Sequence, residues 1–231
     1  MPRIIGHRGF PRRYPENTIA SFLGALLYGA HGVELDVGVS ADNEAVIIHD
    51  TDLERVAGVN ANVDDLLLKD LKTFHLGMGQ TIPTLREALE AIPRGYEVFV
   101  EIKELRATKQ ALRTVVEHGR LDEVIFISFD VDVLKLLRSL NRDARLGINI
   151  DSIEKARQAL ILIKSLGLET VNPPIEALEI VGPEGLRSYL SKVYDAGAKT
   201  VLWTVNEPES IKDFIDEIDY VITDDPTLFH G

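Results

Sequence analysis

Residues 33–50 read VELDVGVSADNEAVIIHD, and this stretch decides the fold. It contains two apolar runs, Val33–Val37 and Ala45–Ile48, with only seven residues between them. A parallel crossover needs about a dozen residues, so the second run is expected to return antiparallel to the first. The pair Asp42-Asn43 tolerates the left-handed conformation of a tight turn. The stretch therefore predicts a strand followed directly by a β-hairpin.

The register of this hairpin predicts a group of polar side chains. A turn about Asp42-Asn43 places Asp36 opposite His49. Because side chains alternate between the two faces of a strand, Glu34, Asp36 and His49 are expected on one side, near the end of the strand.

Short β-rich runs alternate with longer helical patterns along the whole chain, which is typical of βαβ units around a parallel sheet. A chain of 231 residues fits one α/β barrel, which commonly occupies roughly 200–250 residues. A doubly wound open sheet is the alternative, but no Gly-rich dinucleotide loop follows the first strand. We predict a single (β/α)8 TIM barrel domain over residues 1–231. Its strands are expected at Arg3–Gly6, Val33–Val37, Glu97–Lys103, Val124–Ser128, Ala144–Ile148, Thr170–Asn172, Thr200–Val205 and Asp219–Thr223.

Helices are expected between these strands, and Asn17 is expected to act as the N-cap of the first. The stretch 50–82 lacks a clear period, and loops of this length are uncommon unless functional, so it predicts an insertion over the barrel mouth. A surface excursion with a short Asp64–Leu71 helix is an equal alternative. The other helices are expected at Asn17–Tyr28, Leu85–Ala91, Thr108–His118, Val131–Leu140, Ser152–Ser165, Pro183–Ala196 and Pro208–Ile215.

Composition excludes several classes of function. The chain has 37 acidic and 25 basic residues, a net charge of -12, which disfavours nucleic acid and anionic membranes as partners. The absence of cysteine excludes disulfides, thiolate metal sites and thiol nucleophiles. The N-terminus lacks the apolar stretch of a signal peptide, and no run approaches the ~18 apolar residues of a membrane span. We expect a cytoplasmic protein without stable membrane association, and its oligomeric state is left open.

Polar side chains gather at the ends of the first three predicted strands, where the active sites of such barrels lie. Three buried carboxylates at one barrel end need a charge partner, because an unpaired buried carboxylate costs several kcal/mol. A divalent metal would satisfy that need, and oxygen ligands favour Mg²⁺ or Ca²⁺ over zinc or copper. Salt bridges alone are the alternative explanation. The residues are His7, Arg8, Glu34, Asp36, His49, Glu101 and Lys103.

The two histidines at this rim suggest proton transfer. A lone His7 or His49 would more often be a buried histidine with its hydrogen bonds satisfied. Two of them flanking a metal site suit a general acid and a general base that work near neutral pH.

Eight short motifs occur in order across nearly the whole chain. Together they resemble the signature of glycerophosphodiester phosphodiesterases, and they imply a barrel of the phosphatidylinositol-phospholipase-C-like phosphodiesterase type. The motifs are His7-Arg8-Gly9, Pro15-Glu16-Asn17-Thr18, Glu34-Leu35-Asp36-Val37, His49-Asp50, Pro83-Thr84-Leu85, Glu101-Ile102-Lys103, Trp203-Thr204-Val205-Asn206 and Thr223-Asp224-Asp225-Pro226.

The resemblance implies metal-dependent hydrolysis of a small glycerophosphodiester to glycerol-3-phosphate and an alcohol. It implies that Glu34, Asp36 and Glu101 hold one divalent ion, either Mg²⁺ or Ca²⁺, with Mn²⁺ possible. It also implies that His7 and His49 exchange protons and that Arg8 and Lys103 bind phosphate. Trp203 has two equal interpretations, as a core residue or as a wall that faces the glycerol.

Several alternatives stay open. His7 is narrowly favoured as the base and His49 as the acid, and the nucleophile is either the glycerol 2-hydroxyl or water. A catalytically silent phosphate-binding barrel or a metal-dependent isomerase or aldolase would not need the full set of motifs. An enzyme with the same chemistry on lysophospholipids is a closer rival. The segment Arg55-Val56-Ala57-Gly58 departs from the family pattern, and this puts the alcohol specificity in doubt.

Overall fold

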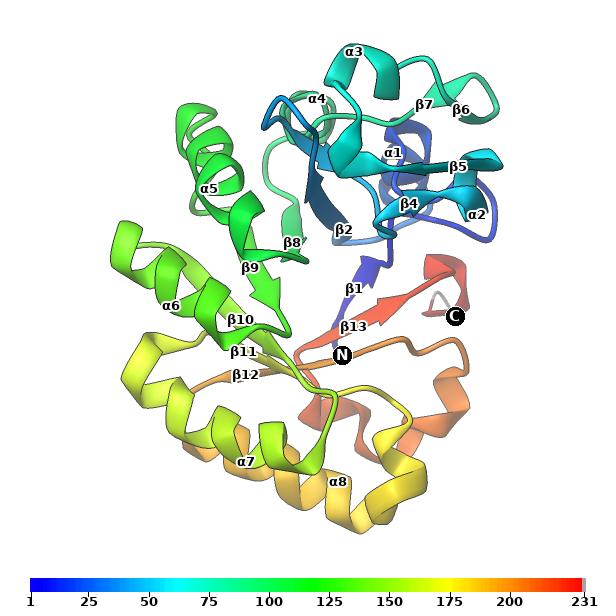
Figure 1. Cartoon of the computed structure of the whole chain (residues 1–231). Coiled ribbons are helices and arrows are strands. Elements are labelled where there is room, and N and C mark those ends of the chain that lie inside the picture. The colour runs from blue at the N-terminus through cyan, green and yellow to red at the C-terminus, as the bar shows by residue number, and fades with distance from the viewer. Residues whose placement is uncertain (230–231) are drawn as a thin grey trace.

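The computed structural model describes residues 1–229 and has the predicted TIM barrel at its centre (Figure 1). Eight parallel strands pair in a ring, and the ring closes because β1 pairs with both β2 and β13. The strands are β1 (Arg3–Gly6), β2 (Gly32–Val39), β8 (Glu97–Ile102), β9 (Val124–Ser128), β10 (Arg145–Asn149), β11 (Thr170–Asn172), β12 (Lys199–Leu202) and β13 (Tyr220–Thr223).

Helices pack around the outside of this ring, and in Figure 1 α5 to α8 lie outside strands β8 to β12. An apolar layer fills the space between helices and strands, while a smaller cluster that includes Ile5, Phe99 and Ile222 fills the barrel itself. The barrel is therefore a packed core rather than a pore. The main helices are α1 (Ile19–Leu27), α4 (Leu85–Ala91), α5 (Thr108–Glu117), α6 (Val131–Leu140), α7 (Ile153–Leu162) and α8 (Ala177–Asp195), which Gly182 interrupts before Pro183.

The prediction of a regular helix at Pro208–Ile215 is wrong. The chain instead forms two 3₁₀ segments, η4 (Pro208–Ser210) and η5 (Lys212–Glu217). Phe214 leaves helical geometry with φ −141° and is buried in the core. Burial of this ring therefore accompanies the loss of a regular helix.

The hairpin after β2 is antiparallel as predicted, but its register differs by one residue. In β3 (Ala45–Ile47), Ile47 pairs with Val37 and Ala45 pairs with Val39. The Ile48 amide donates to the Asp36 carbonyl at 3.0 Å, so the predicted pairing of Asp36 with His49 is wrong.

A longer turn explains this shift. The Ser40 amide donates to the Glu44 carbonyl, and Asn43 has φ 63°. The loop therefore has three residues, Ala41 to Asn43, and it ends in a left-handed residue, which is a common hairpin geometry.

Residues 50–82 form small elements around an apolar cluster that they share with Ile48 of the hairpin, and Leu53 and Leu71 are among its buried members. The predicted Asp64–Leu71 helix is split into η1 (Val63–Asp65) and α3 (Leu68–Leu71). Hydrogen bonds tie the segment to the hairpin turn and to α1, beside which it lies in Figure 1. Its other elements are β4 (Asp52–Leu53), α2 (Glu54–Ala57), β5 (Val59–Asn62), β6 (His75–Gly77) and β7 (Gln80–Thr81).

Charged side chains at or just before the starts of β1, β8, β10, β11 and β12 form an ion network at one end of the barrel. Arg145 contacts Glu97 at 3.0 Å and Glu169 at 2.7 Å. Arg3 contacts Glu97 at 3.0 Å, and Lys199 contacts Glu169 at 3.1 Å. We call these five residues the lower network.

Thr84 begins α4 with a reciprocal pair of hydrogen bonds. Its hydroxyl accepts from the Glu87 amide at 3.1 Å, and the Glu87 carboxylate accepts from the Thr84 amide at 2.7 Å. Thr84→Ala is therefore expected to lower the free energy of unfolding by ~0.5–2 kcal/mol. Urea denaturation would measure this loss. Thr84→Ser, which keeps the hydroxyl, should restore most of it, and equal losses in both variants would contradict the capping role.

Candidate active site

Three carboxylates meet at the end of the barrel opposite the lower network. Glu34 and Asp36 lie on β2, and Glu101 lies on β8 directly beside Asp36 in the parallel register. One oxygen of each lies within 4.8 Å of the others. All three residues are buried, with exposures of 2%, 1% and 7%. The structure thus brings the three predicted metal ligands together.

Two cations contact this cluster without balancing it. The Lys103 Nζ lies 2.9 Å from Asp36 Oδ1 and 2.7 Å from Glu101 Oε1, and the Arg8 Nε lies 3.3 Å from Asp36 Oδ2. Glu34 instead accepts a hydrogen bond from the backbone amide of Arg8. The salt bridges of the alternative explanation are therefore present, yet three carboxylates face two cations, and one of these, Arg8, is also paired with Glu16.

The pKa values show where negative charge is in excess. Burial and the neighbouring Asp36 charge raise the pKa of Glu34 to about 8. The same two causes raise the pKa of Glu101. Burial would also raise the pKa of Asp36, but the charges of Lys103 and Arg8 outweigh it and lower that pKa. A divalent cation would relieve the repulsion, and a purely oxygen donor set suits Mg²⁺, Ca²⁺ or Mn²⁺.

His7 follows β1, and its ring is held by Asp224, which follows the neighbouring strand β13. Its Nδ1 lies 2.7 Å from Asp224 Oδ1, and Asp224 also accepts from the Asn206 side chain at 2.7 Å. Nε2 is then the ring nitrogen left for a substrate. Burial would lower the pKa of His7, but the hydrogen bond to Asp224 and the charge of Glu34 outweigh it and raise that pKa.

His49 is held in a parallel way. Its Nδ1 lies 2.6 Å from Asp50 Oδ1, and Asp50 accepts from Arg55 Nε at 2.6 Å. Arg55 in turn makes two hydrogen bonds of 2.8 Å to Glu16, which also contacts Arg8. The ladder of β3 ends at Ile47, so His49 reaches the site from the segment after the strand and not through the predicted pairing.

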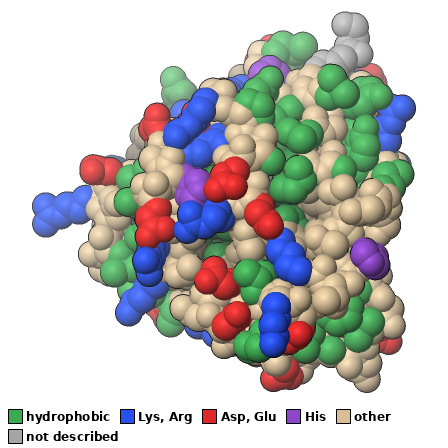
Figure 2. Space-filling view, turned by 90° about the horizontal axis from the view of Figure 1, so that it is seen from above, with side chains coloured by type: hydrophobic (Ala, Val, Ile, Leu, Met, Phe, Trp, Pro, Cys, Tyr) green, Lys and Arg blue, Asp and Glu red, His purple; other side chains and the backbone are tan. Residues whose placement is uncertain are grey.

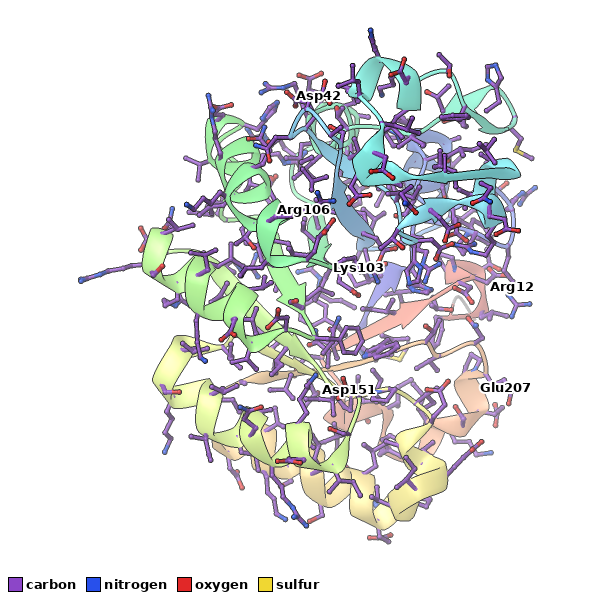
Figure 3. All side chains as sticks on the ribbon, viewed as in Figure 1. Arg12, Asp42, Lys103, Arg106, Asp151 and Glu207 are labelled. Atoms are coloured by element: carbon purple, nitrogen blue, oxygen red, sulfur yellow. The ribbon has the colours of Figure 1, made fainter. Side chains whose placement is uncertain are left out.

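All eight predicted site residues line one cavity of about 260 Å³, which we call the catalytic cavity. Lys103 lies near the centre of the view in Figure 3, with Arg12 and Arg106 on opposite sides. Charged side chains of both signs surround a histidine on the face shown in Figure 2. The lining residues are His7, Arg8, Glu34, Asp36, His49, Glu101, Lys103, Ile127, Phe129, Asn149, Trp203 and Ile222.

Trp203 lies between the barrel core and the catalytic cavity. Its ring packs against the cluster inside the barrel and makes an edge contact with Phe129 at a centroid distance of 5.7 Å. Its Nε1 donates to the Asn172 carbonyl at 2.7 Å. Trp203 and Phe129 thus form one aromatic wall of the catalytic cavity.

The N-cap prediction for Asn17 is wrong. Thr18 caps α1 by accepting from the Ser21 amide at 3.2 Å. Asn17 has φ 55°, is buried, and donates to Asp36 Oδ2 at 2.8 Å. Its amide therefore orients a carboxylate of the cluster.

The sequence interpretation gave no role to Asp50, Asp224 and Asn149. Asn149 ends β10 and donates to Glu101 Oε2 at 3.1 Å. Asp50 and Asp224 occur in two of the family motifs. Asp50 directly follows His49, and Asp224 directly follows the last residue of β13. A buried polar residue at the end of an apolar strand is the signal that could have identified Asn149.

Asp224→Asn is expected to shift the pH dependence that His7 would give to a reaction at this site. If His7 is the base it must be neutral, so kcat/KM rises as pH increases through the pKa of His7. Loss of the Asp224 charge lowers that pKa, so the acid limb should move to lower pH. Initial rates from pH 5 to 9 at saturating metal would measure the shift, and an unmoved acid limb would separate Asp224 from the titrating group.

Comparisons with known proteins agree on one family. The model of the glycerophosphoryl diester phosphodiesterase family matches residues 7–228. A glycerophosphodiester phosphodiesterase of Caldanaerobacter subterraneus is 28% identical, with 96% of this chain and 94% of that protein covered. The crystal structure of a glycerophosphodiester phosphodiesterase from Thermotoga maritima has a TM-score of 0.88 and 32% identity, covering 99% of this chain and 97% of that one.

A further solved structure contains a ligand. It is an Oleispira antarctica phosphodiesterase in complex with the product sn-glycerol-3-phosphate, with a TM-score of 0.86 and 27% identity, covering 98% of this chain and 94% of that one. The family match extends over nearly the whole chain and includes every residue of the carboxylate cluster. This chain therefore belongs to the glycerophosphoryl diester phosphodiesterase family and is an enzyme of that family.

Proposed function

We propose that this enzyme hydrolyses small glycerophosphodiesters to glycerol-3-phosphate and an alcohol. The observation that carries the proposal is the catalytic cavity, in which three clustered carboxylates face two histidines, each oriented by an aspartate. The complex of the Oleispira relative with sn-glycerol-3-phosphate supports the same product.

Glu34, Asp36 and Glu101 would hold one divalent ion, Mg²⁺ or Ca²⁺, with Mn²⁺ also suitable. Bound there, the ion would supply positive charge for the phosphate oxygens. Arg8 and Lys103 line the same cavity and would bind the phosphate from the protein side. The substrate would thus meet positive charge in a protein whose net charge is -12.

The two histidines would divide the proton transfers. With Nδ1 engaged by Asp224, Nε2 of His7 is placed to take the proton of the nucleophile, which is the glycerol 2-hydroxyl or water. Asp50 orients the ring of His49 through Nδ1, so that Nε2 would give a proton to the departing alcohol. Trp203 would pack against the glycerol from the aromatic wall.

We also infer that residues 1–231 act as one domain, with 50–82 as an insertion within it. The pairing of β1 with β13 supports this, because the first and last strands complete one barrel. No helix within residues 1–229 has the length and apolar character to cross a membrane. We propose a cytoplasmic enzyme that acts on small molecules. The excess of acidic residues supports this class of partner, because it disfavours nucleic acid and stable association with anionic membranes.

The products of glycerophosphoethanolamine test the proposal directly. Cleavage on the alcohol side is expected to give glycerol-3-phosphate and ethanolamine, which phosphorus NMR distinguishes from phosphoethanolamine and glycerol. Lysophosphatidylcholine in vesicles belongs in the same panel, because the rival substrate class keeps the chemistry. Phosphoethanolamine as the product would place the scissile bond on the glycerol side, and preference for the vesicles would favour the lysophospholipid activity.

A further inference from the structure

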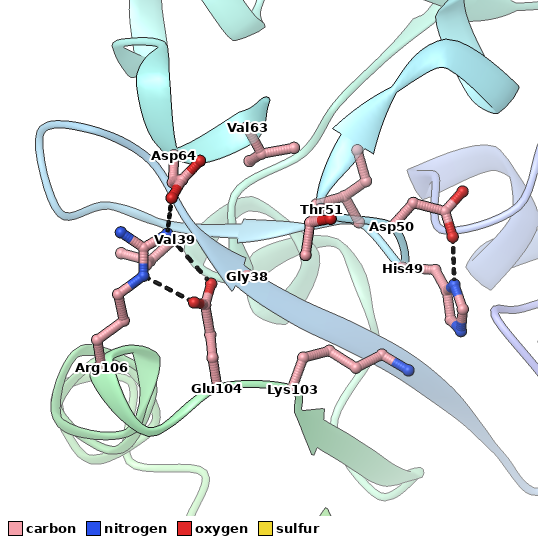
Figure 4. Close-up of a pocket in the computed structure, with 11 residues that line it drawn as sticks. Gly38, Val39, His49, Asp50, Thr51, Val63, Asp64, Lys103, Glu104 and Arg106 are labelled. Atoms are coloured by element: carbon pink, nitrogen blue, oxygen red, sulfur yellow. Dashed lines mark hydrogen bonds and ion pairs between the residues drawn. The ribbon is translucent and has the colours of Figure 1, made fainter. Parts of the chain in front are cut away.

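A second and smaller cavity adjoins the catalytic cavity (Figure 4). It lies between the β2–β3 hairpin, the start of segment 50–82 and the loop after β8, and its volume is about 50 Å³. A water molecule needs about 10–15 Å³ of such volume, so the cavity has room for roughly four small groups. We call it the side cavity. His49 and Lys103 line both cavities, whereas His7 lines only the catalytic one of the two.

The outer wall of the side cavity has an excess of negative charge. Arg106 Nε lies 2.7 Å from Glu104 Oε2, and Arg106 NH2 lies 3.1 Å from Asp64 Oδ2 (Figure 4). Two carboxylates therefore share one guanidinium, which leaves the trio with a net charge of −1. The positive charge of Lys103 is committed to Asp36 and Glu101 on the other side.

We propose that the side cavity binds the departing alcohol and favours a short alcohol with an ammonium group, such as ethanolamine. The inference rests on the proposed function, in which His49 protonates the leaving oxygen. The alcohol must then lie on the His49 side of the phosphate, and His49 is one of the two residues that line both cavities. Its size fits the four heavy atoms of ethanolamine, and the charge of its wall favours the ammonium group over a neutral end.

A pair of diesters separates charge from size. Glycerophosphoethanolamine and the glycerophosphodiester of 1-propanol differ only by an ammonium in place of a methyl group. The ratio of their kcat/KM values, ammonium over methyl, is expected to exceed one in the wild type. Larger alcohols such as inositol should be cleaved less efficiently than ethanolamine.

Three substitutions should move this ratio in opposite directions. Asp64→Asn and Glu104→Gln each remove a negative charge and should lower it about two- to fivefold, as befits partly exposed charges. Arg106→Gln leaves two carboxylates unneutralised and should raise it by a similar factor. Arg113→Gln is the matched control for Arg106→Gln, because Arg113 pairs with Glu117 on the surface of α5 and its loss removes the same single positive charge.

Gly38 tests the size of the side cavity. It lies on β2, and a Cβ added there would meet only Ile48 Cγ2, at an ordinary contact distance of 3.5 Å. Gly38→Ala should therefore fold normally while it fills part of the cavity. We expect kcat/KM for glycerophosphoethanolamine to fall about tenfold, while that for the methanol diester stays unchanged.

The outcomes distinguish this inference from the proposed function. If the wild-type protein cleaves none of the diesters, the proposed function itself is contradicted. A wild type that cleaves them, with a ratio unmoved by Asp64→Asn, Glu104→Gln and Arg106→Gln, would remove only the side cavity as the alcohol site. An equal loss of kcat/KM for glycerophosphoethanolamine and for the methanol diester in Gly38→Ala would lead to the same conclusion.

Discussion

His49→Ala is expected to lower kcat by ~10²–10⁴-fold, the usual contribution of a positioned acid or base. The imidazole is partly exposed, and Asp50 keeps its contact with Arg55 after the substitution, so the fold should persist. Metal affinity should also persist, because His49 is not among the three clustered carboxylates. Steady-state rates with glycerophosphoethanolamine and calorimetric metal titration would measure the two quantities separately.

His75→Ala is a suitable control for this experiment. His75 lies exposed on β6 in the segment 50–82, which directly follows His49, and its replacement should leave turnover unchanged. Near-normal turnover in His49→Ala would remove the histidine from the chemistry. A large drop in both variants would indicate a general effect on the segment.

Removal of divalent metal is expected to lower hydrolysis by about 10³-fold or more, since a metal ion supplies several kcal/mol of charge stabilisation. Without it, three carboxylates face two cations, and the cluster would repel a phosphodiester. Dialysis against a chelator and readdition of Mg²⁺, Mn²⁺ or Ca²⁺ would measure the loss and the recovery.

Asp36→Ala separates ligation from proton transfer. It should weaken metal binding as well as turnover, whereas His49→Ala should affect turnover alone. Thermal unfolding with and without metal gives a readout that is independent of activity, because an ion that binds the folded state raises the melting temperature. Full activity after exhaustive chelation would contradict the assignment of the carboxylates to a metal.

The barrel could be predicted because its strands are short apolar runs separated by clear helical patterns. The bounds of α4 and α6 agree with the sequence prediction, since Thr84 and Asp130 cap them with side-chain oxygens. The prediction failed near Phe214, where burial of one ring competes with local helical preference. Local patterns record such preferences but not the competition.

The hairpin register could not be predicted from the sequence for a related reason. A two-residue turn at Asp42-Asn43 and a three-residue turn that begins at Ala41 use the same residue types. Hydrogen bonds from the Ser40 hydroxyl to Asp42, and from the Glu44 amide to that hydroxyl, accompany the longer turn. The position of His49 beside the cluster was predicted, but the reason given for it was wrong.

The candidate site could be predicted in part. Glu34 and Asp36 were placed together because residues two apart share a face of a strand. Asn17 and Thr18 are both suited to cap a helix, and only the fold shows that Thr18 caps α1 while Asn17 binds Asp36. The contact of Asp224 with His7 joins the two ends of the chain, and no local pattern encodes it.

The lower network has a consequence for heat. Hydration of charged groups becomes less favourable as temperature rises. The desolvation penalty of linked ion pairs, such as those around Arg145, therefore falls. The five side chains stand at the far end of the barrel from His7 and His49. Substitutions at Glu97 or Glu169 should therefore change the unfolding temperature of the protein, while the reaction rate per folded molecule stays the same.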